Sequence, residues 1–156
     1  DTDIVWLRNP FPHLDQDADF QLASNEYVGD PFSLNNAANT GVLYIKSTPL
    51  TIRFFRMWYA ERELHPYNHD QDLFDKWLKY CPVMRESGLR FKFLSTEYFG
   101  GICEPSEDMN SVCSMHATCR IGLEYKRRCL ISMLDDWKKY LSLPLGERES
   151  NPPSWT

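Results

Sequence analysis

The sequence contains no apolar run that approaches the roughly 20 residues needed to cross a bilayer, and no stretch has the pattern of a signal peptide. We therefore predict no membrane span within these 156 residues. A basic excess is also missing, because the formal net charge is −5. A general nucleic-acid surface needs a basic stripe, so that class of protein is disfavoured.

Internal repeats and low-complexity linkers are absent as well, and the length suits a single domain. Hydrophobic residues make up 42% of the sequence and aromatic residues 14%, which is enough to build a hydrophobic core. This aromatic content, together with the interspersed charges, argues against an intrinsically disordered chain. We expect a folded domain.

Five cysteines are present, and none of them forms a C-x-x-C pair, which argues against a zinc ribbon. The odd number rules out full pairing within one monomer. Cys103 and Cys113 flank the acidic, turn-rich loop EPSEDMNSV and can form a disulfide in an oxidising compartment. Small buried thiols are the alternative. The other three cysteines are Cys81, Cys119 and Cys129.

Several segments have the alternation of apolar and polar residues, or the β-branched and aromatic content, that is typical of strands. The predicted strands lie within residues 1–8, 18–24, 42–46, 89–95 and 116–119. Turn-forming residues predict loops over 29–41 and 100–115.

Three segments have the apolar periodicity of helices and begin near Thr48, Asn68 and Gly122. Thr48 is the expected N-cap of the first helix, with Pro49 at its first position and an end near His65. The second helix runs to about residue 80 and the third to about residue 141. The residues expected to face the core are Ile52, Phe55, Trp58 and Tyr59, then Leu73, Phe74, Trp77 and Leu78, and last Leu130, Met133, Leu134 and Trp137.

The order of strands and helices is mixed, which favours the α/β class with a mixed sheet and flanking helices. We expect the domain to occupy residues 1–143. The sequence after Pro144 is rich in Pro, Ser and Glu, so we expect residues 144–156 to form a frayed tail.

Four polar groups lie at the edges of the apolar segments, and each has a purely structural interpretation. Taken alone, a D-x-D pair is a turn at a strand end, and N-T-G is a turn that leads into a strand. An Asn before D-Q-D is a helix N-cap in a capping box, whose Asp residues favour the positive end of the helix dipole. A single His is more often hydrogen-bonded than a metal ligand, and a helical Lys is usually solvated. The groups are Asp1 and Asp3; Asn39, Thr40 and Gly41; His69, Asp70, Gln71 and Asp72; and His116 with Gly122 and Lys126.

The functional interpretation requires these groups to meet. Asp1, Asp3 and His116 offer carboxylate oxygens and an imidazole, a donor set that suits Mn²⁺ or Mg²⁺. Together with Lys126, such an ion can neutralise the charge that develops on a diphosphate leaving group. The amides and carboxylates of Asn39, Asp70, Gln71 and Asp72 suit sugar hydroxyls. The sum describes sugar transfer from a nucleotide-sugar.

Four motifs in this order, DTDIVWLRNPF, NTGVLYIKST, HDQDLFD and HATC-x-x-GLE-x-K, resemble the plant-type nucleotide-diphospho-sugar transferase family. The resemblance runs from Asp1 to about Leu143. Members of this family include arabinosyl- and xylosyltransferases of cell-wall polymers and glycoproteins. It implies a GT-A fold with a Rossmann-like nucleotide-binding half, retention of anomeric configuration, a UDP-sugar donor and Mn²⁺. It also implies a polysaccharide or glycoprotein acceptor and a type II membrane protein that faces the Golgi lumen.

Carried over to this sequence, the resemblance makes Asp1, Asp3 and His116 the metal site: Asp3 and His116 bind the metal directly, and Asp1 contacts the ribose or reaches the metal through water. Gly122 and Lys126 then contact the diphosphate. The residues expected to line the donor-sugar pocket are Asn39, Thr40, Gly41 and Gln71, with Asp70 and Asp72, one of which lies nearest the anomeric carbon. No nucleophile is assigned.

Two departures from the family pattern bear on these expectations. Arg120 stands where the family normally carries a second Cys, which disfavours a disulfide at Cys119. The apolar strand and nucleotide-binding βαβ units that normally precede D-x-D are missing before Asp1. We therefore expect an N-terminally truncated, C-terminal part of the GT-A fold, with a partial transferase domain over residues 1–143.

Two rival functions remain. An inactive relic would keep the architecture and act at most as a binding module. A metal-dependent hydrolase would use Asp1, Asp3, Asp70 and His116, but it does not explain the aromatic helix or the N-T-G context.

Overall fold

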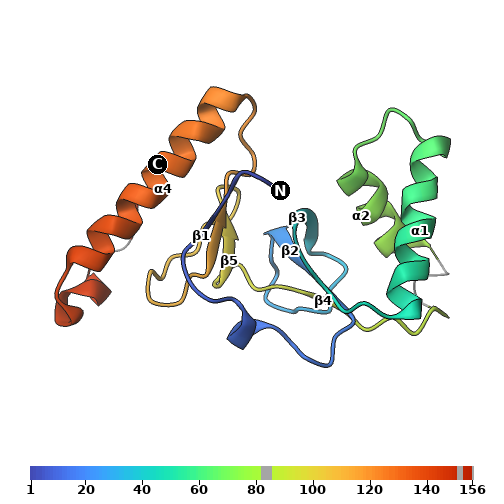
Figure 1. Cartoon of the computed structure of the whole chain (residues 1–156), viewed down its shortest axis with the longest axis horizontal. Helices are drawn as coiled ribbons and strands as arrows, with labels where there is room; N and C mark the ends of the chain where they lie inside the picture. Colours follow the sequence, from blue (N-terminus) through green and yellow to red (C-terminus); the bar gives the residue numbers. More distant parts are fainter. Residues whose placement is uncertain (82–85, 151–152, 156) are drawn as a thin grey trace. The chain divides into compact units, whose positions relative to one another are not determined.

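The computed structural model describes residues 1–81, 86–150 and 153–155, and the chain divides into two compact units (Figure 1). The first unit comprises Asp1–His13 and Ser95–Thr156, and the second comprises Leu14–Leu94. We describe each unit by itself. Among the described residues, none of the helices combines the length and the apolar character that crossing a membrane requires.

The first unit contains a three-stranded mixed sheet and one long helix (Figure 1). The strand order is β1-β6-β5, with β1 antiparallel and β5 parallel to β6. The strand β5 overlaps the segment 100–115 that we predicted to be a loop, and β6 begins before residue 116, where we expected its strand to start. Its elements are β1 (Ile4–Trp6), the 3-10 helix η1 (Phe11–His13), β5 (Phe99–Gly101), β6 (Ser114–His116), α4 (Leu123–Ser142) and the 3-10 helix η2 (Leu145–Ser150).

The core of the first unit forms between this sheet and α4. Met133 is fully buried, as predicted, but Leu134 is 40% exposed, and Cys129 and Tyr140 are buried instead. The C-terminal residues differ from the frayed tail that we expected. Trp155 is buried, and its indole Nε1 donates a hydrogen bond to the carbonyl of Ser106 at 2.6 Å.

The second unit contains another mixed three-stranded sheet, flanked by two helices (Figure 1). The strand order is β3-β2-β4, with β3 antiparallel and β4 parallel to β2. Two register irregularities between β2 and β3 let β3 begin at Ala37, inside the segment 29–41 that we predicted to be a loop. The elements are β2 (Phe20–Glu26), β3 (Ala37–Ile45), α1 (Pro49–Leu64), α2 (Asp70–Tyr80) and β4 (Phe91–Phe93).

The helix α1 begins and ends as the sequence predicts, and its predicted inward face is confirmed in part, because Phe55 and Trp58 pack against the core. Thr48 is its N-cap and forms a capping box with Thr51. The Thr51 hydroxyl also donates to the Lys46 carbonyl at 2.5 Å, which fixes this side chain inward. Thr51 and Phe54 are therefore buried, whereas Ile52 and Tyr59, which we expected in the core, are 45% and 62% exposed.

The helix α2 has the predicted apolar face, because Leu73, Phe74 and Leu78 are buried. Its start differs from the prediction. The N-cap is His69 rather than Asn68, and no side-chain hydrogen bond caps this end of the described helix. The predicted capping box of Asn68 and Gln71 is thus wrong, which leaves the Gln71 side chain available for other contacts.

Together the two units form a mixed α/β structure with mixed sheets and flanking helices, as the order of predicted elements indicated. A cluster of aromatic rings fills the second unit. Phe20 lies at its centre, with its ring centroid 5.4 Å from that of Phe74 and 5.7 Å from that of Phe54.

We predict that Gly100→Ala destabilises the first unit. A Cβ at this position would lie 2.6 Å from the Ser106 backbone nitrogen and 2.8 Å from the Met115 sulfur. Overpacking of this kind typically costs about 1–3 kcal/mol. Urea unfolding followed by tryptophan fluorescence measures the change. Gly146→Ala is the matched control, because no described atom lies within 4 Å of its Cβ position; equal stability of the two variants would contradict the prediction.

We also predict an acid-sensitive contribution from Asp19, which pairs with Arg90 through bonds of 3.3 Å to both of its oxygens. The hydrogen bond from the Arg90 side chain, followed by that from its backbone, holds the pKa of Asp19 below the ordinary value of 3.8. This pair therefore stabilises the fold above the ordinary carboxyl pKa, and the contribution is lost as pH falls through the lowered value.

The test is Asp19→Asn, with the free energy of unfolding measured at pH 7 and pH 3. Asn cannot ionise, so the variant is less stable than the wild type at pH 7, and the difference shrinks toward pH 3. A difference that stays constant between the two pH values would show that the ionised pair contributes nothing.

Candidate metal and diphosphate site

The pairing of β1 with β6 brings the first residues of the chain beside His116, which lies far along the sequence. In the antiparallel register Ile4 lies opposite His116, and the Ala117 amide donates to the Asp3 carbonyl at 3.0 Å. The residues just before β1 therefore lie beside the end of β6. This places Asp1 and Asp3 next to His116, as the functional interpretation of the sequence required.

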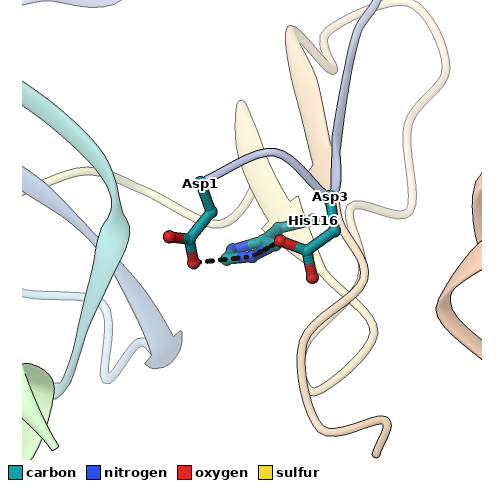
Figure 2. A group of neighbouring side chains, drawn as sticks. All are labelled: Asp1, Asp3 and His116. Atoms are coloured by element: carbon teal, nitrogen blue, oxygen red, sulfur yellow. Dashed lines mark hydrogen bonds and ion pairs between the residues drawn. The ribbon is translucent and has the colours of Figure 1, made fainter. Parts of the chain in front are cut away.

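The three side chains converge on one point. His116 Nε2 lies 3.2 Å from Asp3 Oδ1 and 3.4 Å from Asp1 Oδ2. Figure 2 shows both carboxylates directed at the imidazole from either side of the ring. One potential ligand atom from each residue lies within 4.8 Å of the other two. Ligands about 2.1 Å from an Mg²⁺-sized ion have similar spacings, so the donor set fits such an ion.

Burial differs among the three ligands. The side chains of His116 and Asp3 are 6% and 14% exposed, whereas that of Asp1 is 59% exposed. The site is thus closed on the side of the sheet and open at Asp1. His116 Nδ1 is buried and has no hydrogen-bond partner among the described residues. Hydrogen bonding therefore fixes the ring only through Nε2.

The protonation states suit metal ligands, which must be an ionised carboxylate and a neutral imidazole. Burial lowers the pKa of His116, and the opposing effect of Asp3 is smaller, so the ring is neutral at neutral pH. Burial alone would raise the pKa of Asp3. The hydrogen bond from Lys126 and the other favourable contacts outweigh this effect, and the net pKa of Asp3 is lowered.

Lys126 adds a positive charge beside the carboxylates. Its Nζ donates to Asp3 Oδ2 at 2.7 Å. Lys126 lies in the first turns of α4, and its amide bonds to the carbonyl of Gly122. Gly122 is the N-cap of α4 and has a φ of 95°, a conformation that favours glycine. No side chain of the described chain caps this helix end at Gly122, so its first amides suit an anion.

A disulfide joins Cys103, just after β5, to Cys119, which lies between His116 and Gly122. Of the two alternatives that the sequence left open for Cys113, the structure shows the buried thiol and not a disulfide with Cys103, whereas the expectation that disfavoured a disulfide at Cys119 is wrong. Cys113 is a buried thiol whose pKa is raised by burial. Sequence spacing could not reveal the true pair, because the parallel pairing of β5 with β6 decides which cysteines approach.

The second polar group forms within the second unit, where β3 meets the start of α2. The Thr40 amide donates to Gln71 Oε1 at 3.3 Å, and the Thr40 hydroxyl lies 3.5 Å from Asp70 Oδ2. Asn39 Oδ1 accepts from the Gly41 amide at 2.8 Å. The structure thus brings the N-T-G and D-Q-D motifs together. We predicted this contact because both motifs were expected to line the donor-sugar pocket.

An open pocket of about 350 Å³ adjoins this group. Its lining includes Gln71 and Asp72, which we predicted, and polar residues that we did not assign to the site. The helical spacing of Asp75 and Lys76 from Asp72 was a signal that could have found them. The unassigned polar residues are Asn25, Asn68, Asp75 and Lys76.

Comparison with known proteins gives the family. The sequence model of the nucleotide-diphospho-sugar transferases matches residues 1–130. An uncharacterized protein of Arabidopsis thaliana is 44% identical over 133 residues, which cover 85% of this chain and 36% of that protein. A second uncharacterized protein of the same plant is 33% identical over 141 residues, which cover 90% of this chain and 41% of that protein.

The chain therefore spans less than half the length of these two relatives. No solved structure gives a significant match. The family match covers most of the sequence and both polar groups, from the D-x-D pair through Lys126. The chain belongs to the nucleotide-diphospho-sugar transferase family.

Proposed function

We propose that this chain forms the metal and diphosphate site of a retaining glycosyltransferase, which moves a sugar from a UDP-sugar to a polysaccharide or glycoprotein acceptor. The observation that carries the proposal is the convergence of Asp1, Asp3 and His116 beside Lys126. Family membership implies a nucleotide-sugar donor. The choice of UDP, the retaining course and the acceptor class follow from the resemblance of the motifs to plant cell-wall enzymes.

The proposed cofactor is Mn²⁺ or Mg²⁺, held by Asp1, Asp3 and His116. The imidazole in the donor set favours Mn²⁺, since Mg²⁺ prefers oxygen ligands alone. When bound, the ion supplies a Lewis acid that neutralises charge on the departing diphosphate. Asp3 is the central ligand, because its second oxygen also accepts the hydrogen bond from Lys126.

Lys126 and the amino end of α4 form the proposed diphosphate contact. Lys126 offers three donors, one of which bonds to Asp3 Oδ2. A diphosphate bound beside Asp3 would accept a hydrogen bond from the ammonium group of Lys126. The helix amides after Gly122 would donate to a second phosphate oxygen, with the helix dipole favouring its charge.

The polar group of the second unit is the proposed donor-sugar pocket. Amide and carboxylate side chains along β3 and α2 offer donors and acceptors for hydroxyl groups. Asp70 or Asp72 is the proposed catalytic residue nearest the anomeric carbon, and no nucleophile is assigned. The other proposed sugar contacts are Asn39, Thr40, Gly41 and Gln71.

We further propose that the full-length protein is a type II membrane protein of the Golgi lumen that acts on cell-wall acceptors. The Cys103–Cys119 disulfide supports an oxidising compartment. The chain covers less than half of its two relatives, so activity of the whole protein forms part of this proposal.

The direct test is metal binding. We predict that Asp3→Asn and His116→Ala each weaken Mn²⁺ binding at least about tenfold, as expected when one ligand of a small donor set is lost. Isothermal titration with Mn²⁺ measures the change. His65→Ala is the control, because His65 contacts Glu61 on α1 in the other unit. Unchanged affinity in both site variants would favour the inactive relic.

A second prediction separates the diphosphate contact from the metal ligands. Lys126→Ala is expected to weaken UDP binding in the presence of Mn²⁺ about tenfold, which corresponds to about 1.4 kcal/mol. Binding of Mn²⁺ alone should persist, because Asp3 keeps its carboxylate. The matched control is Lys138→Ala on the same helix, where the exposed Lys138 pairs with Asp135 at 3.2 Å. Equal UDP affinity in both variants would remove Lys126 from the site.

A further inference from the structure

We infer that the Cys103–Cys119 disulfide is a positioning element of the metal and diphosphate site, because it fixes the segment that connects His116 to α4. This inference rests on the proposed function. Cys119 follows β6, which carries the imidazole, and precedes Gly122, where α4 begins. The bond therefore anchors the chain between the metal ligand and the proposed diphosphate contact.

The segment before the disulfide is held closely by β5. The His116 carbonyl accepts from the amides of Ile102 at 3.0 Å and Thr118 at 2.7 Å. The Cys103 amide donates to the Thr118 hydroxyl at 3.2 Å. The approach is so close that a Cβ at Gly101 would lie 2.7 Å from this hydroxyl. These contacts join the segment of His116 and Thr118 to Ile102 and Cys103, so the disulfide at Cys103 acts on the same stretch of chain as the metal ligand.

The segment after the disulfide has no such support. Every residue from Arg120 to Tyr125 is exposed, and Ile121 and Leu123 are 95% and 84% exposed. Burial of apolar side chains therefore cannot determine where the first turn of α4 lies. The next buried residue of this helix is Cys129. Between Thr118 and Cys129, the covalent bond at Cys119 and the Lys126–Asp3 contact are the two fixed points that the described structure shows.

The backbone at Cys119 indicates that this point is constrained. Its φ is 55°, in the left-handed region that residues other than glycine rarely occupy. Such a conformation persists where the surrounding structure imposes it. Here it turns the chain from the sheet toward Gly122, so the disulfide and the turn together set the direction in which α4 starts.

A disulfide that acted only by restricting the unfolded chain would raise stability and leave the native site unchanged. The positioning role makes a different prediction. Below the unfolding temperature, loss of the bond should loosen residues 117–126 and weaken Mn²⁺ binding, while the second unit stays as it is.

The experiment compares the wild-type chain with Cys103→Ser/Cys119→Ser and with Cys81→Ser, a control at a free cysteine in the other unit. Circular dichroism first identifies the temperatures at which each protein is folded. Amide hydrogen exchange is then measured over residues 117–126 and over 20–22, and Mn²⁺ affinity is measured by titration. In the double variant we expect exchange over 117–126 to be at least tenfold faster and Mn²⁺ affinity at least tenfold lower.

Dithiothreitol provides a second route that changes no residue, since it reduces the disulfide to two thiols and itself becomes a cyclic disulfide. It should reproduce both effects in the wild type and in Cys81→Ser, and add nothing in the double variant. Unchanged exchange over 117–126 would overturn the inference, whatever happens to the metal. Faster exchange in a chain whose wild type binds no Mn²⁺ would show that the disulfide orders residues 117–126, and would refute the proposed function and with it the role at a metal site. Faster exchange with unchanged Mn²⁺ affinity would limit the disulfide to a structural role and overturn the inference.

Discussion

The antiparallel pairing of β1 with β6 is the constraint on which the candidate site depends. Each strand has only three residues, yet their register places Ile4 opposite His116. A shift of one residue would turn the imidazole to the other face of the sheet. The buried residues Val5 and Met115 resist such a shift, because they lie opposite each other and belong to the same core. Core packing thus sets the geometry of the polar site.

The pairing of β1 with β6 gathers charged side chains around Asp3. Asp1 and Asp3 supply two carboxylates, Lys126 supplies one ammonium, and the buried His116 ring is neutral. Lys126 holds only one oxygen of Asp3, while the other faces the imidazole. A metal ion and Lys126 can therefore share Asp3 without competing for the same atom.

The sequence predicted the structure best where the interactions that determine it are made between neighbouring residues. Thr48 and Pro49 located the start of α1, because capping depends on neighbouring residues. The inward face of α1 was predicted only in part: Phe55 and Trp58 pack against the core, but the burial of Thr51, whose hydroxyl bonds to the Lys46 carbonyl, was missed. The convergence at His116 was expected from the resemblance of the motifs and has no local signal. The partner of Cys119 was missed for the same physical reason, since only the β5–β6 pairing brings Cys103 to it.

The polar pocket of the second unit adjoins a stretch rich in turn-forming residues, which we proposed as part of the donor-sugar site. Asn39 lies within β3, and its side chain accepts from the Gly41 amide, while Gln71 accepts from the Thr40 amide. These bonds use side-chain oxygens to satisfy backbone amides at the irregular β2–β3 pairing. The same bonds fix the side chains of Asn39 and Gln71 before any ligand arrives. A sugar that entered here would meet ordered groups, so less conformational entropy would be lost on binding.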